Sequence, residues 1–298
     1  IDFICRFVQD EARKMGKEEI EISEMHNIVE GALERVNPKV AKSYRDYRNY
    51  KQDFVQMLDE VYKKSQSIMY IGDKENSNTD SALVSTKRSL IFNQLNKELY
   101  KKFFLTTEEL QACRDGFIYI HDMSARRDTM NCCLFNMQNV LKDGFEMGNL
   151  WYNQPKSLDT AFDVIGDVTI SAASQQYGGF TIPSVDLLLE PYAELSYKKY
   201  IQKYAELGLD KDKAEEIALK EIQRDFEQGF QGWEYKFNSV SSSRGDYPFI
   251  TVTTGTGTGR FAKMASITML NVRKNGQGKD GNKKPVLFPK IVFLYDKN

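Results

Sequence analysis

The sequence predicts an α/β protein in which strands are separated by long helical segments. Residues 247–255 (YPFITVTTG) and 286–296 (VLFPKIVFLYD) are rich in Val, Ile, Phe and Thr, a composition typical of strands. Between Pro183 and Asn238 apolar residues recur among charged ones at a spacing that favours helices packed on other helices. Strands that alternate with helical insertions of this length indicate an α/β barrel or sheet.

The composition limits the classes of protein and ligand. With 298 residues and 41% apolar content, the chain can bury a full core in one large domain or two modest ones. A net charge of −1 provides no global basic field, so we expect no direct nucleic-acid partner and only small anionic ligands. The start does not read as a signal peptide and no apolar run reaches the ~18 residues of a membrane span, so we expect a cytoplasmic protein. Four cysteines without paired C-x-x-C spacing predict reduced thiols and no metal site.

The N-terminal part is predicted to be helical. Residues 20–51 read as two helices, with Ser23 as the N-cap of the first and Asn37-Pro38 as the break between them. Residues 53–70 continue as an amphipathic helix. The buried face of the first helix is predicted from apolar residues at helical spacing, namely Ile28, Val29, Ala32, Leu33 and Val36.

The middle of the chain changes from helix to strand. A polar run at 73–85 is predicted to be a loop at a boundary region, and residues 85–104 are predicted to form a helix. The spacing of Thr106 and Glu109 fits a capping box for a short helix that ends at Gly116. Beyond it, a strand is expected to carry two adjacent thiols.

Cys132 and Cys133 follow a His121-Asp122 turn in an apolar segment. Because side chains alternate along a strand, the two thiols lie on opposite faces and only one can face the interior of a barrel. In an arbitrary apolar strand both would be buried core thiols. On residue type alone, His121 suggests acid–base chemistry, and Asn131 fits either a turn or a hydrogen bond to a ligand.

Five sequence segments, taken in their order along the chain, resemble those of a known protein family. They are 116–149 (GFIYIHDMSARRDTMNCCLFNMQNVLKDGFEMGN), 154–164 (QPKSLDTAFDV), 174–183 (SQQYGGFTIP), 196–200 (SYKKY) and 238–260 (NSVSSSRGDYPFITVTTGTGTGR). Together they resemble the anaerobic, glycyl-radical ribonucleoside-triphosphate reductases. The resemblance implies the front part of a ten-stranded α/β barrel at 53–298, with about three of its strands present. Residues 1–52 resemble the closing helices of an ATP-cone, although from the residues alone a plain helical hairpin is equally open.

The resemblance assigns roles to particular residues. Cys132 is similar to the family's hydrogen donor on the ribose face opposite the radical, so we expect Cys132 inside the barrel and Cys133 packed outside. Asn131 is expected to contact the substrate ribose. Lys156 and Lys199 match positions around a dNTP specificity site, although exposed lysines are usually only solvated.

Two glycine-containing segments are further candidates for close contacts with the backbone. Tyr177-Gly178-Gly179 permits a close backbone approach, without indicating to what. In TTGTGTGR (253–260), backbone amides together with Arg260 could hold a phosphate. On residue type alone, this second segment reads as a flexible turn at a barrel rim.

The resemblance also implies cofactors and partners. A reductase of this family reduces NTPs to dNTPs as a homodimer, with dNTP and ATP effectors and a radical-SAM iron–sulfur activase. Its glycyl radical and zinc belong to a later part than these 298 residues, so we expect the isolated chain to be inactive. Two alternatives are a glycyl-radical enzyme of the pyruvate formate-lyase type and a non-catalytic module for dNTP binding and dimerisation.

Overall fold

The computed structural model describes residues 1–71, 83–126, 129–240 and 245–295. The chain divides into two compact units, Ile1–Gln66 and Ser67–Asn298. Most of the loop expected at 73–85, two residues of the segment before Asn131 and residues 241–244 lie outside the described residues.

The first unit contains helices α1 (Asp2–Lys14) and α2 (Ile22–Val36) and most of α3 (Pro38–Ile71). The predicted break at Asn37-Pro38 is confirmed, and the Asn37 side chain accepts a hydrogen bond from the Lys39 amide at 3.0 Å. Proline suits the first position of α3 because an amide there would have no helical partner.

One local prediction for these helices is wrong. α2 begins at Ile22, before Ser23, and the Glu24 carboxylate accepts a hydrogen bond from the Glu21 amide at 3.3 Å. Glu24 thus provides the contact at the helix start, and Ser23 lies inside the first turn. The helix that begins at Pro38 continues through the amphipathic segment at 53–70 as the single helix α3, because no residue between the two segments breaks the pattern.

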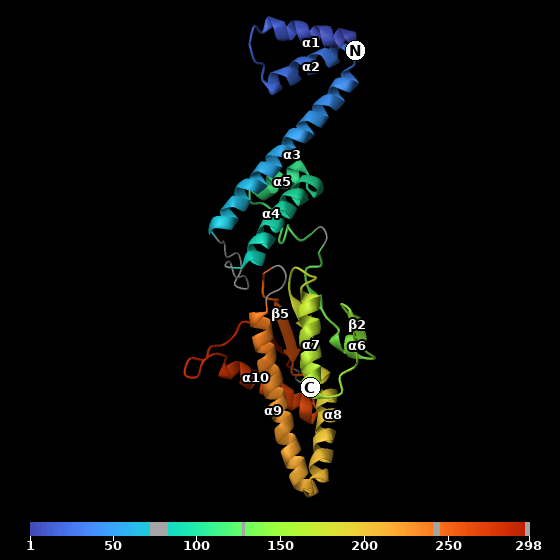
Figure 1. Ribbon diagram of the computed structural model, residues 1–298, viewed down its shortest axis with the longest axis vertical. Helices are drawn as coiled ribbons and strands as arrows, with labels where there is room; N and C mark the ends of the chain where they lie inside the picture. The colour runs from blue at the N-terminus through green and yellow to red at the C-terminus, as the bar shows by residue number, and fades with distance from the viewer. Residues whose placement is uncertain (72–82, 127–128, 241–244, 296–298) are drawn as a thin grey trace. The chain divides into compact units, whose positions relative to one another are not determined.

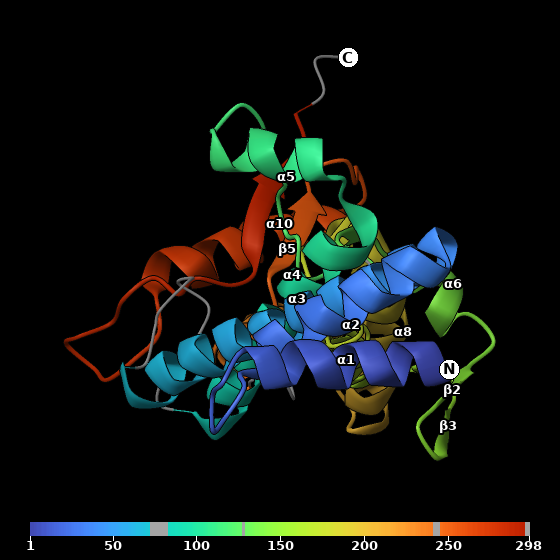
Figure 2. The same cartoon turned by 90° about the horizontal axis from the view of Figure 1, so that it is seen from above.

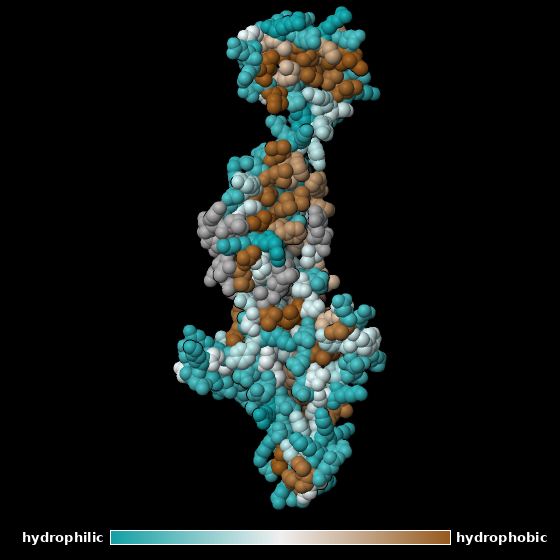
Figure 3. All heavy atoms as spheres, in the orientation of Figure 1, coloured by the Kyte–Doolittle hydropathy of each residue, from teal (hydrophilic) through white to brown (hydrophobic). Residues whose placement is uncertain are grey.

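The first unit is held by polar contacts as well as apolar ones. Glu30 on α2 forms ion pairs with Arg45 and, at 3.1 Å, with Arg48 on α3. His26 and Tyr44 are hydrogen-bonded at 2.5 Å. Figure 3 shows apolar side chains gathered over α1 and α2, where the exposed apolar residues include Phe3 and Ile22.

The second unit opens with α4 (Val84–Phe104) and α5 (Thr107–Arg114). The predicted capping box is confirmed. The Glu109 amide donates to the Thr106 hydroxyl at 3.2 Å, and the Thr106 amide donates to the Glu109 carboxylate at 2.8 Å. The chain then leaves the helix through Gly116, whose φ of 80° is readily adopted by glycine.

A parallel sheet forms the centre of this unit. Its strands are β1 (Cys133–Leu134), β4 (Phe180–Ile182), β5 (Ile250–Thr254) and β6 (Lys290–Phe293), in the order β1-β4-β5-β6. Every neighbouring pair is parallel. The α/β prediction is therefore confirmed, with β4 as a strand that the sequence analysis did not assign.

Helices connect the strands and cover one face of the sheet. They are α7 (Leu158–Ala173), α8 (Val185–Glu206), α9 (Lys211–Ser239) and α10 (Arg260–Asn275). Figure 1 shows α7 and α9 in front of β5, and their buried residues form one core with the inward side chains of β4 and β5. Helices were expected between Pro183 and Asn238, whereas α7 and α10 were not assigned.

A small excursion separates β1 from α7. It consists of α6 (Met137–Leu141) and an antiparallel hairpin of β2 (Phe145–Met147) and β3 (Leu150–Tyr152). Figures 1 and 2 both place α6 beside this hairpin at one margin of the unit. Phe145 and Tyr152 stack across the two strands with ring centroids 5.2 Å apart.

An aromatic cluster joins α7 to α9. The Phe162 ring lies edge-on to Phe230 and Trp233, at centroid distances of 5.0 and 4.8 Å. The Trp233 indole N–H donates to the Phe162 carbonyl at 2.8 Å, so the buried indole is satisfied. The two helices approach closely because Gly229 has no side chain where Phe162 lies.

Replacing Gly229 with alanine should lower the free energy of unfolding by about 1–3 kcal/mol, the usual range for overpacking. A Cβ there would lie 2.2 Å from Cδ2 of Phe162. Gly232→Ala is the matched control in the same helix, because no heavy atom of a neighbouring part of the described chain would lie within 4 Å of its Cβ. Urea unfolding of both variants checks this, and equal stabilities would contradict the packing assigned to Gly229.

Candidate functional site

Cys132 and Cys133 lie on opposite faces of the sheet. Cys133 is the first residue of β1, pairs with Phe180 and packs against the core. Burial raises the pKa of its thiol, and a hydrogen bond with Gln176 opposes that shift. Cys132 directly precedes the strand and is exposed.

The face that carries Cys132 is the one turned away from the helices. Leu134 is next on that face, and the register continues from it through Thr181 to Thr251. Leu134 is 77% exposed. On the neighbouring strands β4 and β5, the residues whose side chains point to the opposite face are buried. The helices therefore cover the side of Cys133 and leave the side of Cys132 open.

The backbone of Gly178-Gly179 lies directly against this open thiol. The Gly179 amide is 3.3 Å from the Cys132 sulfur, and the Gly178 amide donates to the Asn131 carbonyl at 2.6 Å. A Cβ on Gly178 would be 2.7 Å from that sulfur and 2.3 Å from Asn131 Oδ1. The close approach expected for these glycines is thus directed at Asn131 and Cys132.

The His121-Asp122 turn is hydrogen-bonded to the same pair. Asn131 Nδ2 donates to Asp122 Oδ2 at 3.0 Å, and the Cys132 thiol donates to Asn131 Oδ1 at 3.7 Å. His121 Nδ1 is 2.6 Å from the same carboxylate oxygen, with 71% of its side chain exposed. The sequence analysis did not assign Asp122 a contact with the site, although its place in the turn before the cysteines was the available signal.

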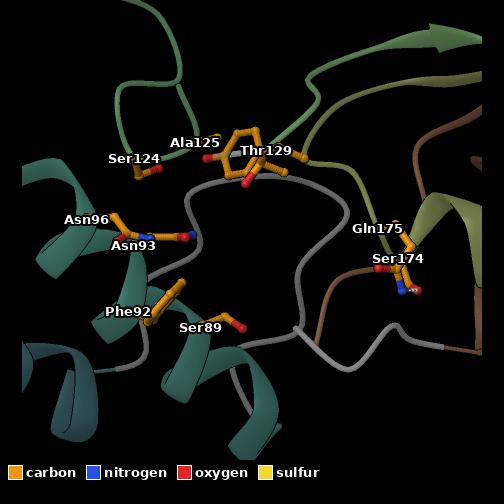
Figure 4. A pocket seen from close by; sticks show the side chains of 10 residues that line it. Ser89, Phe92, Asn93, Asn96, Ser124, Ala125, Thr129, Ser174 and Gln175 are labelled. Carbon is orange, nitrogen blue, oxygen red and sulfur yellow. Dashed lines mark hydrogen bonds between the residues drawn. The ribbon is translucent and has the colours of Figure 1, made fainter. Parts of the chain in front are cut away.

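A cavity of about 240 Å³ lies next to this segment. Figure 4 shows Phe92, Asn93 and Asn96 of α4 on one side of it, and Ser174 and Gln175 after α7 on another. Its described lining is uncharged and is completed by Ser89, Ser124, Ala125, Thr129 and Tyr177.

One wall of the cavity continues along the chain into the segment that carries the thiol. The Tyr177 amide donates to the Met130 carbonyl at 2.9 Å, so a wall of the cavity runs into the Asn131-Cys132 segment. Amide and hydroxyl groups beside aromatic rings can hydrogen-bond and stack a planar, uncharged group. No sequence pattern predicted the α4 wall, because these residues meet the strands only in the tertiary structure.

Lys156 and Lys199 are both exposed and belong to segments that the structure joins. The Leu158 amide, at the start of α7, donates to the Ser196 hydroxyl of α8 at 2.8 Å. A hydrogen bond from Ser157 lowers the pKa of the Asp159 carboxyl, and the charge of Lys199 lowers it further, against partial burial. The two lysine-bearing blocks therefore form one polar surface region.

Acidic and phenolic groups adjoin that region. The Tyr200 hydroxyl donates to Asp225 at 2.8 Å, and burial is the main cause that raises the pKa of both groups. The Tyr204 hydroxyl donates to Glu221 at 3.0 Å, and this bond raises the pKa of Tyr204. Any anion bound by the lysines would thus also lie near carboxylates.

In the glycine-rich segment after β5, two of the amides expected to hold a phosphate have a partner within the protein. The amides of Gly255 and Gly257 donate to Asp186 Oδ2 at 3.0 and 2.8 Å, so a carboxylate of the protein already occupies them. Asp186 is fully buried, and its Oδ1 has no hydrogen-bond partner among the described residues. Arg260 is exposed, and its guanidinium lies 4.5 Å from the centre of the Tyr197 ring.

Among the residues that the structure describes, no three His, Cys, Asp or Glu side chains are placed to hold a metal ion together. No described helix combines the length and apolar character that crossing a membrane requires.

Comparison with protein families gives two matches. The family model "Anaerobic ribonucleoside-triphosphate reductase" matches residues 75–298, and the ATP cone domain model matches residues 1–53.

Curated relatives carry the same name. The anaerobic ribonucleoside-triphosphate reductase of Enterobacteria phage T4 is 35% identical over 74% of this chain and 36% of its own length. Those of Haemophilus influenzae and Escherichia coli are 31% and 30% identical over 94% and 93% of this chain. The chain spans 40% of the length of each of these two relatives.

Among solved structures, similarity is found to the anaerobic ribonucleotide reductase from Thermotoga maritima in complex with dATP and CTP. That chain is 14% identical, with a TM-score of 0.46 over 75% of this chain and 40% of its own length. The sequence matches, and not this distant structural likeness, carry the family assignment.

Gly178→Ala should displace Asn131 and Cys132, because its Cβ would lie under 3 Å from both. We expect a loss of about 1–3 kcal/mol of unfolding free energy and a changed rate of Cys132 alkylation by iodoacetamide. Gly179→Ala is the matched control, since its nearest contact would be an ordinary 3.5 Å to the Phe249 ring. Urea unfolding and peptide mass spectrometry measure both effects. Wild-type behaviour of Gly178→Ala would refute the close approach.

Proposed function

The chain belongs to the anaerobic ribonucleoside-triphosphate reductase family, and on that premise we propose that it supplies Cys132 to the reduction of NTPs to dNTPs. One observation supports this role. Cys132 has an exposed thiol on the open face of a parallel sheet, held between Asn131 and Gly179 beside an uncharged cavity. The family membership favours this reaction over that of a pyruvate formate-lyase type enzyme.

In the proposed reaction, Cys132 acts on the ribose face opposite the radical. Its thiol gives a proton to the 2′-hydroxyl, which leaves as water, and the two electrons that convert NTP to dNTP come from an external reductant, formate or a thioredoxin-like protein. The glycyl radical of the family, which we assign to residues outside this chain, would supply the oxidising equivalent that starts the reaction. Asn131 Nδ2 carries two N–H groups, of which the contact with Asp122 uses one, so the other is available to a ribose hydroxyl.

We place the rest of the substrate nucleotide near the cavity. Thr129 is three residues before Cys132, a separation of at most about 10 Å along an extended chain. That reach suits a ribose at the thiol with its base toward the cavity. An uncharged lining fits a base better than it fits a triphosphate, which attracts Lys and Arg.

Effector binding is proposed for the surface of Lys156 and Lys199. Two ammonium groups on segments joined by the bond between Leu158 and Ser196 suit a dNTP triphosphate. The match of residues 1–53 to the ATP cone supports ATP as a second effector. The same observations favour a second candidate function, in which this chain by itself binds dNTPs without turnover.

Partners and organisation complete the proposal. We place a boundary between an ATP-cone-like segment at 1–52 and the catalytic part at 53–298, close to the end of the family match at 53. Dimerisation would use α8, where Leu187 and Leu195 are exposed, and α9, where Tyr235 is exposed. A radical-SAM iron–sulfur activase and a zinc site outside these residues follow from the family. Free thiols suit the reducing cytoplasm.

The reaction is tested by anoxic CTP reduction with the activated full-length parent. Cys132→Ala should reduce dCTP formation below detection, because no other described thiol lies on the open face beside Asn131. Cys133→Ala is the matched control and should retain activity, with some loss of stability because Cys133 packs on the core. A parent that forms a glycyl radical but no deoxynucleotide from any NTP would overturn the reductase proposal.

Effector binding is tested on this chain by calorimetry with each dNTP. Lys156→Ala and Lys199→Ala should each weaken binding about tenfold or more, as expected for a lost hydrogen bond to a charged group. Lys198→Ala removes an exposed neighbouring charge on the same helix and should leave the affinity unchanged. Equal affinities of the wild type and all three variants would remove these lysines from the site.

A further inference from the structure

We propose that Asp122 is a positioning residue that sets the orientation of the Asn131 amide and, through it, the hydrogen bond of the Cys132 thiol. The inference rests on the proposed function of Cys132. It starts from three contacts in series, namely His121 Nδ1 to Asp122 Oδ2 at 2.6 Å, Asn131 Nδ2 to Asp122 Oδ2 at 3.0 Å, and Cys132 Sγ to Asn131 Oδ1 at 3.7 Å.

The two ends of an asparagine amide do opposite things to a thiol. An oxygen facing the sulfur accepts the S–H and favours the protonated thiol. An NH₂ group facing the sulfur would donate to it and favour the thiolate. A thiol that must deliver hydrogen has to remain protonated, so the orientation of Asn131 affects the chemistry of Cys132.

Asp122 decides this orientation because an ionised carboxylate only accepts hydrogen bonds. The nitrogen of Asn131 must therefore point to Asp122, which leaves the oxygen for Cys132. Gly178 leaves room for this arrangement, since any side chain there would collide with Asn131 Oδ1. The amide nitrogen is thus held by Asp122, and the amide oxygen lies in the space that Gly178 leaves open.

The turn around Asp122 holds the carboxylate in place. Asp122 has a φ of 51°, in the left-handed region that aspartate tolerates better than most residues. Its carbonyl accepts from the Ala125 amide at 2.9 Å, and the His121 carbonyl accepts from Arg126 Nε at 2.8 Å. Its side chain is only 20% exposed, which limits competition from water for the bond with Asn131.

The experiment measures the alkylation rate of Cys132 by iodoacetamide in this chain, with tandem mass spectrometry separating Cys132 from Cys133. Asp122→Ala frees the amide to turn its NH₂ group to the sulfur, so the rate at neutral pH should rise about tenfold, the worth of one hydrogen bond. Asp122→Asn keeps an oxygen that accepts from Asn131, and it should stay within about twofold of the wild type.

Asp143→Ala is the matched control, because Asp143 also has a positive φ, 66°, in a turn after α6. Asp143→Ala should leave the alkylation rate of Cys132 unchanged. It shows how far alanine at a position of positive φ by itself affects the protein. A wild-type rate in Asp122→Ala, or equal acceleration in Asp122→Asn and Asp122→Ala, would overturn the inference. If Asp122→Ala does not fold, an accelerated rate in folded Asp122→Asn would also overturn it.

The alkylation needs no nucleotide, radical or activase, so its outcome is separate from that of CTP reduction. Acceleration in Asp122→Ala combined with no deoxynucleotide from the parent would leave the positioning intact and remove the proposed reaction. Unchanged alkylation combined with Cys132-dependent dCTP formation would leave the reaction and remove the positioning role.

Discussion

The close approach of the Gly178-Gly179 backbone to Asn131 and Cys132 is the contact on which the candidate site depends. It brings the entry to β4 against the entry to β1, and a side chain on Gly178 would collide with both partners. The parallel pairing of Cys133 with Phe180 continues this approach into the sheet. The pairing also fixes which thiol is exposed, because a shift of one residue would exchange the faces of Cys132 and Cys133.

The candidate site and the buried Asp186 lie at opposite ends of the strands of the sheet. Cys132 and the cavity lie where β1 and β4 begin. The hydrogen bonds that Asp186 accepts from two glycine amides lie where β4 and β5 end. Helix α7 spans this distance. Its first residue is bonded to Ser196 near Lys199, and its last turn leads to Ser174 and Gln175 of the cavity. Sixteen helical residues extend about 24 Å, so one rigid element joins the proposed effector surface to the proposed substrate site.

Buried polar groups show how the same residue types serve structure or chemistry. Asp186 is fully buried and uses one oxygen to hold two amides of the glycine-rich segment, which makes that segment part of the scaffold. Asp122 is partly exposed and contacts Asn131 beside a thiol that faces an open surface. Asp186 lies in the first turn of α8 and Asp122 lies in a turn, and neither role can be told from the residue type.

The sequence by itself determined several local elements and the family. The capping box of Thr106 and Glu109 and the break at Asn37-Pro38 involve neighbours within a few residues, so the local pattern was sufficient. The alternation that separates Cys132 from Cys133 is likewise a local property of a strand. The order of the motifs along the chain predicted the reductase family, because each motif can be recognised from its residues without knowledge of the surrounding structure.

Only the tertiary structure decided which groups meet. The α4 wall of the cavity, the place of Gly178 beneath Asn131 and the occupation of the glycine amides by Asp186 join residues separated by tens of positions. Such contacts depend on how helices and strands pack, and no local spacing encodes them. The same holds for the glycine-rich segment before Arg260, where a buried carboxylate from another segment accepts hydrogen bonds from two of the amides expected to hold a phosphate.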